Sequence, residues 1–208
     1  MLDRHFIKLL KWPLDTTAAY LVKQQVSANK VTVFGFIIGM MVIPSLAFQA
    51  YSLALLFIII NRLCDGLDGA IARQTQPTDL GGYLDITLDF IFYSGVIFGF
   101  ALANPEMNAL PAAFLIFSFM GTGSSFLAFA IMAEKRQIKQ LDYGKKSLFY
   151  LGGLTEGAET ISLFIFICLM PAYFTSAAWL FASLCWLTTG TRIYASYLAL
   201  KTNAQESN

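Results

Sequence analysis

The sequence predicts an all-α fold, an integral membrane bundle of six transmembrane helices preceded by an amphipathic interfacial helix at the N-terminus. Of its 208 residues, 57% are hydrophobic and 13% are charged, whereas about 25% of the residues of a soluble domain are charged. Six stretches are also apolar over about 20 residues, which is the length that crosses a bilayer. The composition excludes a soluble enzyme and a disordered chain, and the net charge of +1 gives no reason to expect a nucleic-acid partner.

Residues 1–28 are expected to form an amphipathic helix that lies in the cytoplasmic interface of the membrane. At the helical period, apolar side chains gather on one face and basic side chains on another. The apolar face holds Leu2, Phe6, Leu9 and Leu10. The basic face holds Arg4, Lys8 and Lys11. A soluble amphipathic helix that caps the domain is the alternative.

Residues 29–201 are expected to form one domain of six spans, and residues 202–208 a cytoplasmic tail. The spans are predicted at 31–49, 51–73, 80–103, 110–133, 148–170 and 175–199. Prolines fall at or near span ends, where a missing backbone donor is tolerated. The connections 104–109 and 171–174 are short, which predicts antiparallel neighbours.

The basic residues predict how the bundle lies in the membrane. All 14 Lys and Arg residues fall on one side of it, before the first span, at the end of the second, between the fourth and fifth, and at the end of the chain. The positive-inside rule then places both termini and the 134–147 connection in the cytoplasm. A bacterial inner membrane is the expected location.

Four aspartates lie at depths where ionisable groups are rare. Such a group at membrane depth costs about 2.5–3.5 kcal/mol on insertion scales, so it usually marks a functional site. At a rise of about 1.5 Å per residue, the four carboxylates lie in one layer roughly 21–27 Å from the outer face. Asp65 and Asp68 are three residues apart on the second span. Asp85 and Asp89 are four apart on the third, so each pair projects from one face of its helix.

Four converging carboxylates repel one another at low dielectric, so they need protons or bound cations. Oxygen ligands in a small site suit Mg²⁺ or Mn²⁺, and two such ions can clamp the oxygens of a phosphoryl transfer. The alternative is that the acids only pair with Arg62 and Arg73. Two arginines cannot neutralise four carboxylates and the nearby Asp79.

The residues around these acids resemble the signature of the CDP-alcohol phosphatidyltransferase family, D-x-x-D-G-x-x-A-R followed by G-x-x-x-D-x-x-x-D. The first part runs from Asp65 to Arg73 and the second from Gly81 to Asp89. The resemblance implies a six-span enzyme that pairs as a homodimer and transfers the phosphatidyl group of CDP-diacylglycerol to a small alcohol with release of CMP. Small residues on the fourth span suit close helix packing and are compatible with a dimer, namely Gly121, Gly123, Ser124 and Ser125.

The resemblance also implies a role for each motif residue. Asp65, Asp68 and Asp85 would hold a two-metal centre. Asp89 would stand beside it, as a further ligand and as the catalytic base that takes the proton of the alcohol. Small residues would let the nucleotide approach and let the third span begin close to the second. The implied donor-binding residues are Asn29, Thr32, Asp68, Gly69, Ala72, Arg73 and Gly81. The alternative for Asn29 and Thr32 is an interfacial helix cap.

Three further charges fall in the same layer and bear on the acceptor. Glu156 and Glu159 lie on the fifth span and Arg192 on the sixth. Acids repel a phosphate and favour an ammonium group or sugar hydroxyls, so we expect a polyol or amino alcohol such as inositol or serine. Lys135 and its neighbours could instead bind the phosphate of a phosphorylated acceptor. The alternative function is therefore phosphatidylglycerophosphate synthase, which uses glycerol-3-phosphate. The two glutamates have a second interpretation as ion-pair partners of Arg192.

A small cation transporter or channel is the alternative of another class, because acids inside membranes also line ion paths. It predicts repeat symmetry or broken helices and charges at several depths. The sequence shows neither feature. A scaffold without activity is a third interpretation, which the presence of all four aspartates disfavours.

Overall fold

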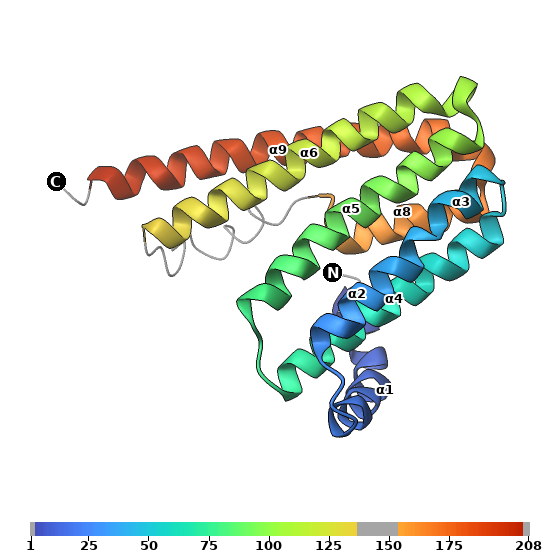
Figure 1. Cartoon of the computed structure of the whole chain (residues 1–208). Helices are drawn as coiled ribbons and strands as arrows, with labels where there is room; N and C mark the ends of the chain where they lie inside the picture. Colours follow the sequence, from blue (N-terminus) through green and yellow to red (C-terminus); the bar gives the residue numbers. More distant parts are fainter. Residues whose placement is uncertain (1–2, 137–153, 206–208) are drawn as a thin grey trace.

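The computed structural model describes residues 3–136 and 154–205, and every element in these residues is a helix (Figure 1). The elements are α1 (Asp3–Lys23), α2 (Ala28–Met40), α3 (Val42–Ala47), α4 (Tyr51–Gln74), α5 (Asp79–Ala103), α6 (Pro105–Lys135), α8 (Gly157–Leu169), the 3-10 turn η1 (Pro171–Tyr173) and α9 (Phe174–Gln205). A helix pairs its own backbone N–H and C=O groups, which lipid requires because it offers no water. The predicted all-α class is confirmed for these residues.

The number of membrane-crossing helices stays a prediction, because the described residues support a smaller set of candidate spans. Three stretches are long and apolar enough to cross a membrane, Ala28–Ala47, Asp79–Ala103 and Pro105–Lys135. A fourth is added if Gly157–Leu169 and Pro171–Lys201, which are bent by 119° at their junction, count as one span. The described residues thus contain three or four candidate spans by length and composition. Four charges between Arg62 and Arg73 reduce the apolar character of α4, and α8 has only 13 residues.

The predicted fifth span, 148–170, is wrong at its N-terminal end. Residues 148–153 lie outside the described residues, and the helix begins only at Gly157. Glu156 and Glu159 form a capping box, in which each side chain accepts a hydrogen bond from the other residue's backbone N–H. A capping box starts a helix because it satisfies N–H groups that have no partner in the first turn.

The predicted first span consists of α2 and α3, which meet at Met41. Two glycines of α2 let α4 pack closely against it. A Cβ on Gly39 would lie 2.8 Å from Asn61 Nδ2, and a Cβ on Gly35 would collide with the Cβ of Cys64. Asn61 Nδ2 also donates a hydrogen bond to the Gly35 carbonyl at 3.1 Å. Packing and this hydrogen bond together fix α4 against α2.

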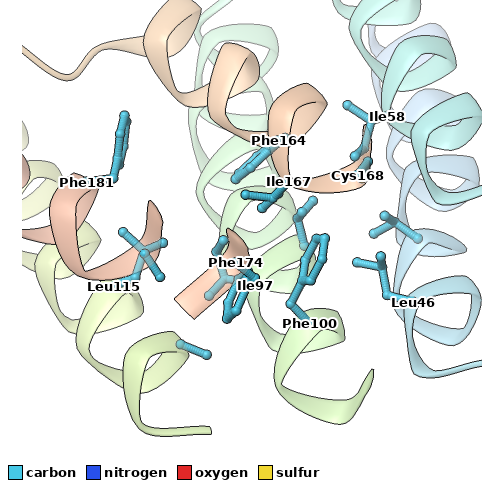
Figure 2. Packing of buried hydrophobic residues seen from close by; sticks show 14 of the residues in the cluster. Leu46, Ile58, Ile97, Phe100, Leu115, Phe164, Ile167, Cys168, Phe174 and Phe181 are labelled. Atoms are coloured by element: carbon cyan, nitrogen blue, oxygen red, sulfur yellow. The ribbon is translucent and has the colours of Figure 1, made fainter. Parts of the chain in front are cut away.

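Buried apolar side chains from α3, α4, α5, α6, α8 and α9 form the main core (Figure 2). Phe100 stacks on Phe174 with ring centroids 4.7 Å apart, and Phe92 meets Phe164 edge to face at 6.4 Å. Helix α2 packs against both α4 and α5, and α3 does the same. The two aspartate-bearing helices are therefore positioned mainly through the α2–α3 segment that contacts both.

Helix α1 packs against α4 (Figure 1). Ala18 is buried in a small cluster that includes Ile71, and Gln74 Nε2 donates to the carbonyl of Asp15 at 2.8 Å. The side chains of residues 1–10, from which the amphipathic faces are predicted, lie outside the described residues. Trp12 and Tyr20 are exposed, which suits a helix at a membrane interface, where aromatic side chains are enriched.

Candidate metal centre and adjoining cavities

Three of the four predicted aspartates come together at the meeting point of α4 and α5. One carboxylate oxygen from each of Asp65, Asp68 and Asp85 lies within 4.8 Å of the other two. Two of them project from one face of α4, as the three-residue spacing predicts. Asp68 is buried, Asp65 is half-buried and Asp85 is exposed. We call these three residues the carboxylate group.

The carboxylate group fits a divalent cation on one further observation. Asp68 Oδ2 is buried and has no hydrogen-bond partner within the described part of the chain. An unpaired buried carboxylate oxygen is costly, because it has lost its water without gaining a partner. Three carboxylates are hard oxygen ligands of the kind that Mg²⁺ and Mn²⁺ prefer. A bound cation would give Asp68 Oδ2 a partner and offset the repulsion among the three acids.

Asp89 lies outside the carboxylate group and is held by two other residues. Arg62 donates from Nη2 to Asp89 Oδ1 at 2.6 Å and from Nη1 to Oδ2 at 3.3 Å. The Tyr93 hydroxyl donates to the same Oδ2 at 3.0 Å. The expected cluster of four acids is thus a group of three beside a fourth that is paired with an arginine.

The ion-pair alternative from the sequence therefore applies to part of the site. Arg62 pairs with Asp89 and lies 3.5 Å from Asp65 Oδ2. Within residues 11–136 and 154–201, no ion pair joins Arg73 to these acids. The sequence motif predicts no functional role for Arg62, although its position three residues before Asp65 indicates that the two side chains share a helix face.

A cavity of about 490 Å³ adjoins the carboxylate group. Its wall contains most of the predicted donor-binding residues, namely Asn29, Thr32, Asp68, Gly69, Ala72 and Gly81. Arg73 is not part of the wall, and its Nη1 lies 3.3 Å from the place of a Cβ on Gly69. Polar residues of two turns, which no sequence pattern predicts as part of the site, complete the wall, namely Gln25, Ser27, Thr75, Gln76 and Thr78. Only the tertiary fold brings these two turns together. We call this space the donor cavity.

Gly81 brings the start of α5 against α2, not against α4 as expected. A Cβ there would lie 3.0 Å from Asn29 Oδ1 and 3.1 Å from Thr78 Oγ1. Thr78 is the N-cap of α5 and accepts a hydrogen bond from the Gly81 N–H at 3.0 Å. The cap of α2 is Ser27, without a side-chain cap hydrogen bond. Helix capping therefore does not account for Asn29.

A second cavity, of about 330 Å³, lies between α5, α6, α9 and the start of α8. Its wall includes two predicted acceptor residues, Glu156 and Arg192, but neither Glu159 nor Lys135. Arg192 Nη2 lies 3.8 Å from Glu156 Oε1, and Arg192 Nη1 donates to the Thr122 carbonyl at 3.2 Å. Hydroxyl-bearing residues complete the polar part of the wall, namely Tyr93, Thr122, Thr155 and Thr160. We call this space the acceptor cavity, after the two predicted acceptor residues in its wall.

Comparison with known proteins gives consistent results. The family model described as CDP-alcohol phosphatidyltransferase matches residues 25–194. The chain is 53% identical over 201 residues to the inner membrane protein YnjF of Escherichia coli, covering 97% of this chain and 98% of that protein. It is 26% identical over 186 residues to archaetidylinositol phosphate synthase of Pyrococcus horikoshii, covering 89% and 91%.

Among solved structures, the fold is similar to that of Mycobacterium tuberculosis phosphatidylinositol phosphate synthase with CDP-DAG bound. The TM-score is 0.64 at 18% sequence identity, and the match covers 88% of this chain and 93% of that one. At this identity the likeness concerns the fold.

Proposed function

Because the chain belongs to the CDP-alcohol phosphatidyltransferase family, we propose that it transfers the phosphatidyl group of CDP-diacylglycerol to a small alcohol and releases CMP. The observation that carries the proposal is that the carboxylate group adjoins the donor cavity, whose wall includes Asp68 and Asp85. A cavity lined by both apolar and polar residues suits a donor that keeps its acyl chains in the bilayer and its nucleotide in water. The bound CDP-DAG of the mycobacterial structure supports the same donor.

The donor cavity offers suitable surfaces for a nucleotide diphosphate. Gly69 and Ala72 leave room for the ligand to approach the backbone of α4. Asn29 and Thr32 offer polar groups from α2. Arg73, whose guanidinium lies beside Gly69, supplies a cation for charge-assisted hydrogen bonds to the diphosphate.

Asp65, Asp68 and Asp85 would hold the divalent cation, Mg²⁺ or Mn²⁺. When bound, such a cation supplies charge neutralisation on the phosphoryl oxygens. We assign the general base to Asp89, which takes the proton of the acceptor hydroxyl as its oxygen attacks the phosphorus that carries diacylglycerol. The bond from that phosphorus to the CMP phosphate oxygen breaks, and CMP leaves. General-base assistance of this kind contributes about 10²–10⁴-fold.

The acceptor cavity favours an acceptor without a phosphate. The charge of Arg192 is already compensated by Glu156, and its guanidinium is buried. The surrounding hydroxyl groups suit a polyol or an amino alcohol such as inositol or serine. Glu159 serves the capping box and Lys135 lies at the exposed end of α6, so neither supports the proposal.

A phosphorylated acceptor is the second candidate. Two relatives are named as synthases of an inositol phosphate lipid, and Arg192 is a cation in the cavity wall. Inositol phosphate therefore joins glycerol-3-phosphate as an acceptor to be tested.

The experiment is a screen of acceptors with the purified protein in vesicles that contain CDP-diacylglycerol and Mg²⁺. CMP release is measured with serine, inositol, inositol phosphate and glycerol-3-phosphate. We expect release with inositol or serine. Strong turnover of glycerol-3-phosphate would overturn the acceptor preference. Cation flux across the same vesicles without CMP release from any acceptor would replace the enzyme with the transporter alternative.

We further propose six membrane crossings in a bacterial inner membrane, with α1 in the cytoplasmic interface and both termini in the cytoplasm. The one-sided distribution of Lys and Arg supports this topology, and the E. coli relative is named an inner membrane protein. A homodimer is also proposed from the family. Gly121 and Gly123 do not support it, because Cβ atoms there would meet Trp186 and Phe90 of the same chain.

A further inference from the structure

Arg62 is a largely buried cation that reaches two of the four aspartates. Its side chain is 17% exposed, and it contacts Asp89 at 2.6 Å and Asp65 at 3.5 Å. It stands outside the family motif, which begins at Asp65. Removing one partner of such a buried pair leaves an uncompensated charge, so the pair resists separation.

Residues from three helices hold the Arg62 guanidinium in place. Asn61 Oδ1 accepts hydrogen bonds from Arg62 Nε at 2.9 Å and from Nη2 at 2.5 Å. Asn61 is itself anchored on α2 through the carbonyl of Gly35. The guanidinium carbon lies 5.2 Å from the ring centre of Phe92 and 5.4 Å from that of Tyr93, within cation–π range. Nη1 and Nη2 of Arg62 are therefore held in place as two hydrogen-bond donors to Asp89.

This arrangement decides which part of Asp89 remains available. An ionised carboxylate offers about four lone-pair sites, two on each oxygen. Oδ2 accepts from both Arg62 Nη1 and the Tyr93 hydroxyl, so both of its sites are used. Oδ1 accepts from Arg62 Nη2, which leaves it one site. Asp89 is thereby oriented to accept one further donor on Oδ1.

We propose that Arg62, with Tyr93, is a positioning residue for the transfer reaction, holding Asp89 apart from the carboxylate group with one Oδ1 site left for the acceptor hydroxyl. The inference rests on the proposed function. Tyr93 lines the acceptor cavity, while Arg62 and Asp89 line a small pocket shared with the carboxylate group. The Tyr93 hydroxyl thus links Asp89, the proposed base, to the acceptor cavity.

The first test measures Mn²⁺ binding by electron paramagnetic resonance without any substrate, in a double-mutant cycle of Arg62→Lys and Asp89→Asn. An ammonium group cannot hold a carboxylate by a two-point fork, so Asp89 is released toward the carboxylate group. Arg62→Lys should then bind Mn²⁺ about tenfold tighter, a gain that disappears in the Asp89→Asn background. Asp89→Asn alone should change the affinity by less than about threefold, because Asp89 is not a ligand in this arrangement.

The second test measures CMP release. Arg62→Lys should lower kcat by about tenfold or more with the KM for CDP-diacylglycerol within about twofold, and should have no further effect in the Asp89→Asn background. Tyr93→Phe removes one hydroxyl, keeps the fold, and should lower kcat by about threefold. Arg136→Lys, at the end of α6, is the matched control and should change neither readout.

Equal effects of Arg62→Lys on Mn²⁺ affinity in both backgrounds would overturn the inference. The inference would also be overturned if neither the native chain nor Arg62→Lys bound Mn²⁺. In Arg62→Lys the released Asp89 should act as a further ligand beside the carboxylate group. An absence of CMP release by the native chain would instead count against the proposed function, while the Mn²⁺ cycle still decides where Asp89 is held.

Discussion

Replacing Asp68 with Asn should make the metal-free protein more stable and remove its response to Mg²⁺. The physical reason is that Asp68 Oδ2 is buried without a hydrogen-bond partner among the described residues. Oxygens of Asp65 and Asp85 lie within 4.8 Å and add repulsion. Asparagine keeps the shape of the side chain and loses the charge. A residue placed for metal binding should thus cost stability when the metal is absent.

The magnitude follows from the burial of this one oxygen. Leaving a buried polar group unpaired costs about 1–3 kcal/mol, and relief of the repulsion acts in the same direction. For a chain of this length, 1 kcal/mol corresponds to about 2–4 °C in Tm. We expect Asp68→Asn to raise the Tm by about 2–12 °C in a chelator. Mg²⁺ at 100 times its Kd should stabilise the native protein by about 2.7 kcal/mol, and the variant by far less.

The assay is thermal unfolding in detergent, followed by the fluorescence of the three tryptophans, in a chelator and in Mg²⁺. Asp79→Asn is the matched control, since Asp79 is exposed in the first turn of α5 and outside the carboxylate group. It should lose only the helix-dipole contribution of about 0.3–1 kcal/mol and keep the full Mg²⁺ response. A lower Tm of Asp68→Asn in chelator, or a native-sized Mg²⁺ response, would refute the reasoning.

Three further variants test other parts of the structure. Asp89→Asn should lower CMP release by about 10²–10⁴-fold while CDP-diacylglycerol binding stays within about twofold, and retained turnover would remove Asp89 from its role as base. Gly39→Ala should lower the free energy of unfolding by about 1–3 kcal/mol, because its Cβ would meet Asn61. Gly190→Ala, where a Cβ meets nothing within 4 Å, should raise it by about 0.5–1 kcal/mol; equal melting shifts of the two variants would contradict the packing described. Ala72→Leu should raise the KM for CDP-diacylglycerol by about tenfold or more by filling the donor cavity, with kcat at saturation changed less; an unchanged KM would place the nucleotide elsewhere.

Much of the site could be predicted because its signals are local. The three-residue spacing of Asp65 and Asp68 puts both on one face of α4 whatever surrounds that helix. The small residues Gly69 and Ala72 follow on the same helix, and both line the donor cavity. Both features follow from helical geometry once long apolar stretches form helices, which pair their own backbone groups in lipid.

The start of α8 could not be read from hydropathy, because apolar residues continue on both sides of it. The helix starts at Gly157 because of a pair of glutamates, Glu156 and Glu159, which form its capping box. The sequence predicts the same glutamates as acceptor ligands from their depth alone. In the structure both belong to the capping box, and Glu156 also pairs with Arg192. A charged residue in a predicted span can thus cap a helix, form an ion pair or bind a ligand, and its position in the sequence does not distinguish these roles.

The amino-acid sequence by itself determined that the protein is helical and that it belongs in a membrane, and it predicted that the four aspartates share one layer, because hydropathy and helical spacing act over short distances. Only the tertiary structure decided how those aspartates divide. Asp85 joins Asp65 and Asp68, whereas Asp89 turns to Arg62 and Tyr93. This division depends on how α2 and α3 position α4 relative to α5. The spacing of residues along one helix cannot predict the distance between side chains on two helices.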